Sequence, residues 1–521
     1  MPRGRRGIVQ TVRSWFGGKH EKRRGSGVQW RGFDGAAMGQ RTAGWRTPSS
    51  SANAEIETGL IPLRDRSRDI VRNTPYGKRL ITALTTNLVD TGLTPTLDLG
   101  SDKREKRVMD IFEPWSEVCH PSGPMTFFGI QALLGRSWFE AGEVLVRRMM
   151  YKNHDELGRG IPPLHLQPLE ADHLPIDKTE ALADGSSIEQ GVEFDGNARL
   201  KAYHLYKVHP GAPWTPGRGF LGRSETHRYL ADDVRHVYEM WRPGQVRGLP
   251  CMHPIVMLSW DLAGYADTEG VRAKSAATFV AVVTGGDDDW MSDAGSDALT
   301  SSKDVDGTVL LDSWGRRVER LSPGLVCKAG PGTHVDFTKP GTAEGYKDFI
   351  SAGVHQLAAG GGTSYEELSG DLSLVNFSSA RMGANINHKL IRGFRELVFI
   401  PFALNPMWRW FIDACILYGL LDDSADYYRV KWRQPAQSSV DRLTDAKADE
   451  LQLRLGTHSR PEIIAASGRD PETVDREIER DQRKRDKLGI VLDSDPRQTT
   501  RNGQIQTATW KAPASTTTGE I

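Results

Sequence analysis

The chain has 521 residues, of which 38% are hydrophobic and 26% charged, and its 67 Lys and Arg residues balance its 67 Asp and Glu residues. This composition is typical of a soluble globular protein of about two to four domains. The chain contains no run of about eighteen apolar residues, so no transmembrane span is expected. Its four distant cysteines favour a reducing compartment over a disulfide scaffold.

The N-terminal segment is strongly basic. Residues 1–46 contain eleven Lys or Arg residues and two acids, a net charge of +9, so the remainder sums to −9. This Gly-rich segment lacks the apolar core of a secretory signal. We predict a disordered arm over residues 1–54, which either only solubilises the chain or touches nucleic acid or an acidic partner.

Helical and strand patterns follow the arm. Apolar residues recur at helical spacing over 63–92, where Pro75 is expected to interrupt the helix. Residues 164–208 alternate between apolar and polar side chains, which predicts an antiparallel β region. Further helices are expected at 103–112 and 127–139, and further strands at 92–99, at 141–150 and within 231–248.

The second half of the chain predicts longer helices and an α+β fold class overall. Residues 254–283 form a helical candidate rich in small residues, and an Asp-rich loop with short strands follows it. Helical spacing returns at 386–394 and after Pro406, before a strand at 427–435. Residues 438–490 are predicted to be charged helices, and residues 491–521 a disordered tail.

A helix, a Gly-rich polar loop and a second helix are predicted between Gly341 and Phe402. Gly360, Gly361 and Gly362 should end the first helix, because glycine frees the backbone. Ser378 or Ser379 should cap the second helix. On residue types alone, the pair of helices forms a lid, a gate or a channel wall. The first helix should carry one apolar stripe: Tyr346, Phe349, Ile350, Val354 and Leu357.

No motif predicts a metal or a cofactor. Cys119-His120 and Cys251-x-His253 lack a second ligand pair at zinc spacing. The Asp-rich loop 287–306 lacks the residue order of an EF-hand. The segment LAAGGGTS lacks the lysine with which a phosphate loop reaches its nucleotide.

No catalytic residues are predicted either. His204 and His209 lie close in sequence to Glu193 and Asp195, and a histidine with carboxylates could transfer protons. No Ser or Cys nucleophile motif accompanies them. The residues therefore favour a structural or binding role over an enzyme.

Seven blocks of the sequence occur in a familiar order between about residues 55 and 490. The most specific are RPGQVRG (242–248) and SYEELSGDLSLVNFSSAR (364–381). With these blocks the chain resembles the phage portal proteins of the lambda-like family. It departs from that family in two peripheral segments, CHPSGPMTF (119–127) and SSVDRLTDAKAD (438–449).

The resemblance implies a ring-forming subunit with a multi-domain portal fold. Such a fold has a wing, a helical stem, a β-containing clip and a helical crown. The family order implies these parts: wing 55–250, first stem helix 251–278, clip 279–340, second stem helix 341–360, tunnel loop 361–378, tunnel-side helix and rest of the wing 379–437, and crown 438–490.

The resemblance also implies a function. The ring, usually a dodecamer, would sit at one capsid vertex of the virion, after assembly in the host cytoplasm, and double-stranded DNA would be packaged and ejected through it. The implied partners are further copies of the chain, DNA, the terminase large subunit, the head–tail adaptor and the major capsid protein, without a membrane. The alternatives are another head–tail connector or tail structural protein, or a nuclease or packaging ATPase.

A wall along which DNA slides should carry few cations, since each neutralised phosphate strengthens binding. Residues 361–379 contain three acids and no Lys or Arg, as this requires. In the clip, Asp287, Asp288, Asp289 and Trp290 are the candidates for docking terminase and adaptor. The candidates for facing DNA in the tunnel loop and helix are Thr363, Ser364, Glu366, Glu367, Ser373, Asn376, Asn385, Lys389 and Arg392.

Overall fold

The structure is a computed structural model that describes residues 49–151, 160–212, 225–284, 325–329, 345–373, 376–435 and 441–490, with residues 44 and 47. The chain divides into two compact units, Met1–Ser51 and Ala52–Ile521, and the elements below belong to the second. Most of the predicted arm, the tail after residue 490 and most of the predicted clip lie outside the described residues. The four docking candidates Asp287, Asp288, Asp289 and Trp290 also lie outside the described residues.

The first helices pack on one another at the position where proline was expected to interrupt them. α1 (Ala52–Asn73) and α2 (Pro75–Val89) are separated by Thr74, whose Oγ1 accepts a hydrogen bond from the Gly77 amide at 3.2 Å. This N-cap followed by Pro75 in the first turn confirms the predicted break. α3 (Asp102–Val118) extends beyond the predicted helix, and α4 (Phe127–Ala141) packs against both α1 and α2.

Small antiparallel sheets follow, and together with the helices they confirm the α+β class. β2 (Glu143–Met150) lies between β3 (Leu164–Glu170) and β9 (Val234–Tyr238). Five strands form a second sheet in sequence order, and the last of them was not predicted: β4 (Glu180–Ala181), β5 (Ser187–Glu189), β6 (Val192–Phe194), β7 (Leu200–Tyr206) and β8 (Thr226–Leu230). A third sheet consists of the antiparallel pair β1 (Thr94–Leu97) and β12 (Val430–Arg433).

An aromatic cluster forms the centre of the main core. Phe112, Trp115, Phe127, Trp408 and Phe411 are all buried, with ring centroids 4.8 to 5.8 Å apart. The buried indole nitrogens stay hydrogen-bonded, since Trp115 donates to Leu164 O and Trp408 to Tyr427 O, each at 2.8 Å. The cluster therefore binds α9 (Asn405–Leu417) to α3 and α4, which are about 300 residues earlier in the chain.

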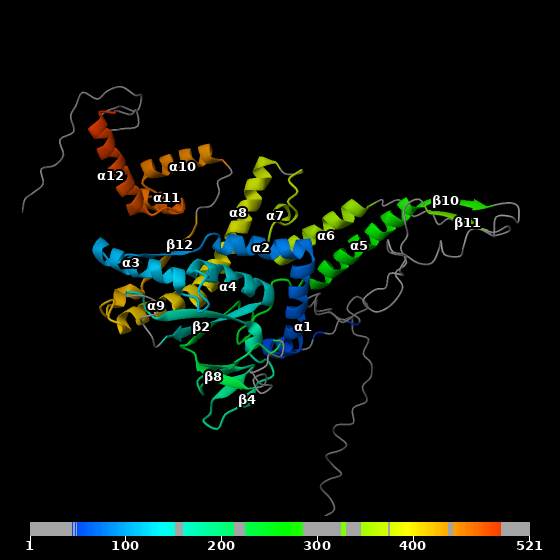
Figure 1. The fold of residues 1–521 in the computed structure, drawn as a ribbon, viewed down its shortest axis with the longest axis horizontal. Helices are drawn as coiled ribbons and strands as arrows, with labels where there is room; N and C mark the ends of the chain where they lie inside the picture. The colour runs from blue at the N-terminus through cyan, green and yellow to red at the C-terminus, as the bar shows by residue number, and fades with distance from the viewer. Residues whose placement is uncertain are drawn as a thin grey trace, which may run out of the picture. The chain divides into compact units, whose positions relative to one another are not determined.

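Two helices lie side by side after the sheets (Figure 1), and a parallel strand pair continues from them. α5 (Val256–Thr278) packs on α6 (Tyr346–Gly361), and β10 (Phe279–Thr284) pairs with β11 (Leu325–Ala329). The prediction that one helix continues to Val283 is wrong. The β-branched and aromatic residues of FVAVV favour a strand at the end of that segment.

The last part of the chain is helical. A short α7 (Tyr365–Ser369) precedes α8 (Phe377–Phe394), and α8 continues into a π-helical segment, η8 (Arg395–Leu404), and then into α9. The predicted charged helices are confirmed as α10 (Arg442–Leu455), α11 (Arg460–Ala466) and α12 (Pro471–Leu488), and none of their residues is buried. No helix in the described part of the chain is both long and apolar enough to cross a membrane.

Candidate functional site

The predicted helix–loop–helix is present, with one correction. α6 ends at Gly361, and Gly362 follows with φ 80°, so the glycines end the helix as expected. A Cβ on Gly361 would lie 2.7 Å from Leu80, so this glycine also allows α6 to approach α2. The prediction that a serine caps the second helix is wrong, because α8 begins at Phe377 and both Ser378 and Ser379 lie inside its first turn.

The predicted polar loop contains the short helix α7. The Ser364 side chain caps it by accepting a hydrogen bond from the Glu367 amide at 3.2 Å, and Gly370 ends it with φ 72°. Leu368 is buried and Tyr365 stacks on His355 at 3.8 Å between ring centroids. The capping pattern Ser-x-x-Glu before a leucine was the sequence signal for this helix.

The Glu367 carboxylate joins three helices. It accepts hydrogen bonds from Asn87 Nδ2 at 2.5 Å, from Thr363 Oγ1 at 3.0 Å and from Asn387 Nδ2. The backbone carbonyl of Glu367 accepts a further hydrogen bond from Arg79 Nε at 3.0 Å. These contacts tie α7 to α2 and to α8. With the Ser364 cap, three of the predicted DNA-facing residues, Thr363, Ser364 and Glu367, use their polar atoms within the chain.

Replacing Glu367 should loosen α7. Glu367→Ala removes an acceptor from two amide side chains and should cost about 1.5–3 kcal/mol, the range for hydrogen bonds to a charged group. Hydrogen exchange over 363–369 should accelerate accordingly. Glu366→Ala, one residue earlier on the half-exposed side, is the matched control and should change stability by no more than about 0.5 kcal/mol. Equal effects of both substitutions would contradict the joining role of Glu367.

α8 has three distinct sides. At about 100° per residue, Asn387 and Ile391 of α8 share one side with Arg395, the first residue of η8, and all three are buried. Arg395 donates to Leu88 O at 2.9 Å and to Asn87 O at 2.6 Å, which fixes this side on α2. A second side is polar and exposed and contains the predicted residues Asn385, Lys389 and Arg392. The third side is apolar and exposed: Met382, Ile386 and Leu390 of α8, continued by Leu397 of η8. We call these four residues the apolar stripe.

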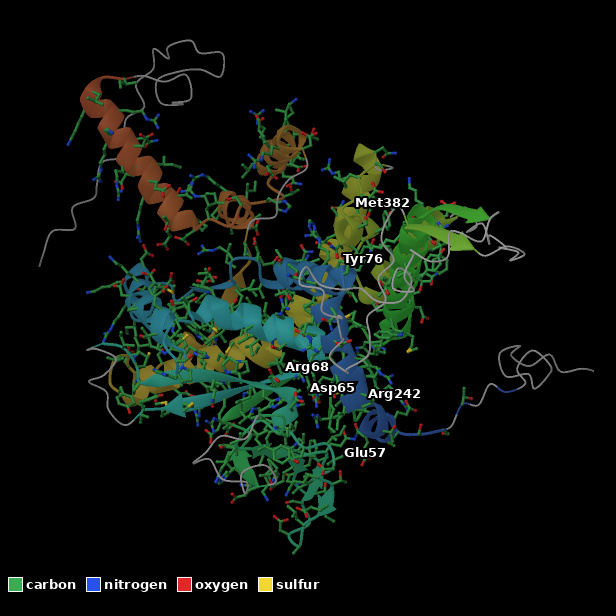
Figure 2. All side chains as sticks on the ribbon, turned by 45° about the vertical axis from the view of Figure 1, so that its right-hand side comes forward. Glu57, Asp65, Arg68, Tyr76, Arg242 and Met382 are labelled. Atoms are coloured by element: carbon green, nitrogen blue, oxygen red, sulfur yellow. The ribbon has the colours of Figure 1, made fainter. Side chains whose placement is uncertain are left out.

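The apolar stripe is strongly exposed. Met382 is 67% exposed, Ile386 63% and Leu397 74%. Figure 2 labels Met382 on α8. Contiguous exposed apolar side chains of this kind mark an interaction surface. The apolar side that the sequence predicts for α6 is partly buried: Val354 and Leu357 are covered, and Phe349 is exposed.

A cluster of His209, Glu170 and Asp172 resembles a metal site but is part of an ion-pair network. His209 Nε2 lies 3.0 Å from Glu170, and both stand close enough to Asp172 for the three to hold a metal ion. Arg68, on α1 (Figure 2), donates to Glu170 at 3.2 Å and to Asp172 at 2.7 Å, and Arg64 lies 3.0 Å from Asp172. A cation bound here would lie beside two guanidinium groups, so we assign no metal to this cluster.

The residues around Glu193 also form an ion-pair network. Its carboxylate accepts a hydrogen bond from Arg228 Nε at 2.7 Å and lies 3.0 Å from His204 Nε2 and 3.4 Å from Lys201 Nζ. The hydrogen bond from Arg228 is the main cause that lowers the pKa of Glu193 to about 2. A carboxylate with so low a pKa is a poor proton acceptor near neutral pH.

The RPGQVRG block builds a buried ion network. Arg247 and Glu143 are almost completely buried, and Arg247 Nη2 donates to the carboxylate at 2.5 Å. The same carboxylate lies 2.8 Å from His236 Nε2 and accepts from the Gly248 amide at 3.0 Å. Burial would raise the pKa of Glu143, but Arg247 and His236 outweigh it and hold that pKa well below its usual range. A Cβ on Gly248 would lie 2.1 Å from Gly142 O, so this close approach requires glycine.

Comparison with known proteins identifies the class. The model of the family "Phage portal protein, lambda family" matches residues 38–395. The chain is 26% identical over 474 residues to the probable portal protein of Halomonas phage phiHAP-1, covering 86% of this chain and 85% of that one. It is 20% identical over 474 residues to portal protein B of Escherichia phage lambda, covering 84% and 87%.

A solved structure also aligns. It is a chain from the neck of a native GTA particle computed with C12 symmetry, with a TM-score of 0.39 and 14% identity over 79% of this chain and 94% of that chain. The sequence matches define the class, a phage portal protein. The chain belongs to the lambda family of these proteins, and its place is therefore in the virion, at the portal vertex.

Proposed function

We propose that the chain assembles into a ring, a dodecamer, and that duplex DNA passes along the polar side of α8 during packaging and ejection. The observation that carries this proposal is the three-sided α8. Subunits of a ring meet through two unlike faces. A helix beside the axis then needs one side for its own subunit, one for its neighbour and one for the channel. Its buried, apolar and polar sides meet these three needs.

The charge on the polar side supports weak, sequence-blind contact with DNA. Three cations lie on this side, Lys389, Arg392 and Arg381, and Arg381 is paired with Asp445 of α10 at 2.7 Å. Glu366, Ser373 and Asn376 lie on the preceding segment, half-exposed or exposed. Each phosphate neutralised by a cation would strengthen binding by counterion release. Few cations beside acidic and neutral residues keep the wall from holding DNA in place.

The other parts of the chain receive roles from their position in the family order. α5 and α6 are the stem, and the segment that contains β10 and β11 is the clip, whose residues 287–290 dock the terminase large subunit and then the head–tail adaptor. The wing contacts the major capsid protein, and α10 to α12 form the crown. Assembly takes place in the host cytoplasm. The portal itself is not an enzyme, and ATP hydrolysis belongs to terminase.

Electron microscopy of the purified chain tests the proposal. A closed ring with an axial opening wide enough for duplex DNA supports it. A monomer with nuclease or ATPase activity would refute it. An assembly without an axial opening would favour the alternative, another head–tail connector or tail structural protein.

Added cations on the polar side should retard DNA. We expect Ser373→Lys with Asn385→Lys to leave rings intact, to slow packaging and to steepen the salt dependence of DNA binding by about 0.9 for each additional phosphate that is neutralised. The control is Asn197→Lys with Ala183→Lys, two exposed turn positions of the five-stranded sheet, which should package at the normal rate. Unchanged packaging in both pairs would place the polar side of α8 away from the channel.

A further inference from the structure

α12 carries its cations on one side. At about 100° per residue, Arg476, Arg480, Arg483, Lys484 and Lys487 fall within an arc of about 100°. We call these five residues the basic stripe, and all of them are exposed. The stripe spans eleven residue steps, or about 16 Å of helix.

The opposite side of α12 faces the chain. Val474, Gln482 and Arg485 lie on that side and are only half-exposed, and α12 packs against α11. Two of its acids pair with residues outside α12, Asp475 with Arg460 and Glu477 with Arg469. The basic stripe is therefore turned outward.

Ion pairs leave a surplus of positive charge on the stripe. Arg476 pairs with Glu472 at 3.0 Å and Arg483 with Glu479 at 2.5 Å. Arg480, Lys484 and Lys487 have no acid within ion-pair distance among the residues that the structure describes. The outward side thus carries three uncompensated cations.

Helix physics alone does not explain this arrangement. The helix dipole favours cations near the C-terminus, but it acts equally around the axis and sets no preferred side. Arg480 and Lys484 each have an acid one turn earlier, where an ion pair could form, but Glu477 pairs with Arg469 and Asp481 with Arg485. A one-sided surplus instead indicates a polyanion that approaches from outside the chain.

We propose that the basic stripe binds the phosphate backbone of duplex DNA without reading its sequence. This inference rests on the proposed portal function, because it takes DNA as the polyanion that the ring meets. The length of the stripe, about 16 Å, matches the rise of about five phosphates along one strand. Contacts from these side chains to phosphate oxygens position DNA without specifying its sequence.

The test uses rings of the full chain and a covalently closed circular plasmid, which cannot thread through a closed ring. The triple variant Arg480→Gln, Lys484→Gln and Lys487→Gln should lower plasmid affinity at least tenfold at about 0.1 M salt. The plot of log affinity against log salt should flatten by about 0.9 for each phosphate that is no longer neutralised. Arg480→Lys alone should preserve binding, because it keeps the charge.

A matched control separates the stripe from net charge. Lys103→Gln, Lys106→Gln and Lys447→Gln remove the same charge from other exposed positions and should leave affinity and salt slope unchanged. Equal binding by the two triple variants would overturn the inference and leave the portal proposal standing. Loss of rings in the stripe variant alone would overturn it too, by making the stripe a contact between subunits. Absence of rings in the unaltered chain would instead overturn the portal function.

Discussion

Arg247→Ala should destabilise the chain by about 3–5 kcal/mol, since it leaves the Glu143 carboxylate charged and buried without its main partner. Arg247 is fully buried, with its guanidinium on both carboxylate oxygens. Chemical denaturation followed by tryptophan fluorescence measures the loss. Arg66→Ala, which removes an exposed arginine from α1, should change the free energy of unfolding by no more than about 0.5 kcal/mol.

A double substitution separates pairing from packing. Glu143→Met with Arg247→Met removes both charges together, and apolar replacement of a whole buried ion pair is often neutral or stabilising. We expect the double variant to be more stable than either single variant. A double variant that is as unstable as the sum of the single losses would show that the charges themselves, not their pairing, hold this region.

The same network makes stability depend on pH. Burial lowers the pKa of His236 by more than the contact with Glu143 raises it. The pKa of the folded imidazole is therefore below its ordinary value of 6.5, and the ring stays neutral at pH values just below 6.5. The unfolded chain then binds the extra proton, and stability falls as the pH drops below about 6.5. Glu143 has a lowered pKa against its ordinary 4.5, so its contribution is lost on further acidification. Urea midpoints between pH 7 and pH 4 should fall steadily, and His236→Gln should flatten the upper part of that decline.

Ile386→Asp with Leu390→Asp should abolish ring assembly while each subunit still folds. Both side chains are exposed on the apolar stripe of α8, so the subunit itself loses little. In a ring each carboxylate would lie in an apolar contact, which costs several kcal/mol. Every 1.4 kcal/mol weakens one contact about tenfold. Light scattering after size exclusion chromatography should show monomers at concentrations where the unaltered chain forms rings.

The control places the same charge change on another side of α8. Asn385→Asp with Lys389→Gln also lowers the charge by two, but on the polar side, and rings should persist. If the apolar-stripe variant also formed normal rings, the stripe would not be a subunit contact. If only the polar-side variant lost its rings, the assignments of the two sides would be reversed.

The sequence predicts most of the regular elements, because their signals are local. Pro75 and its preceding threonine mark the break between α1 and α2, and alternation marks the strands between residues 164 and 208. The strand β10 was missed because small residues before it extend the helical pattern into FVAVV. β8 was missed because its five residues THRYL contain few apolar positions.

The candidate site is harder to predict because its contacts are distant in sequence. The polar side of α8 follows from helical spacing alone. The joining role of Glu367 does not, since its partner Asn87 is 280 residues away. Arg247 and Glu143 are 104 residues apart, and charged residues are usually assigned to the surface. Burial of such a pair is a property of the assembled fold.

The buried network of Glu143, Arg247 and His236 also restricts how this family member can evolve. Any single replacement of Glu143 or Arg247 passes through a chain with an unpaired buried charge. An apolar pair at these positions could be stable, but a chain with only one of the two replacements would be strongly destabilised. We therefore expect descendants of this chain to keep both residues or to exchange both together, and saturation mutagenesis should find each of them intolerant alone but permissive in combination.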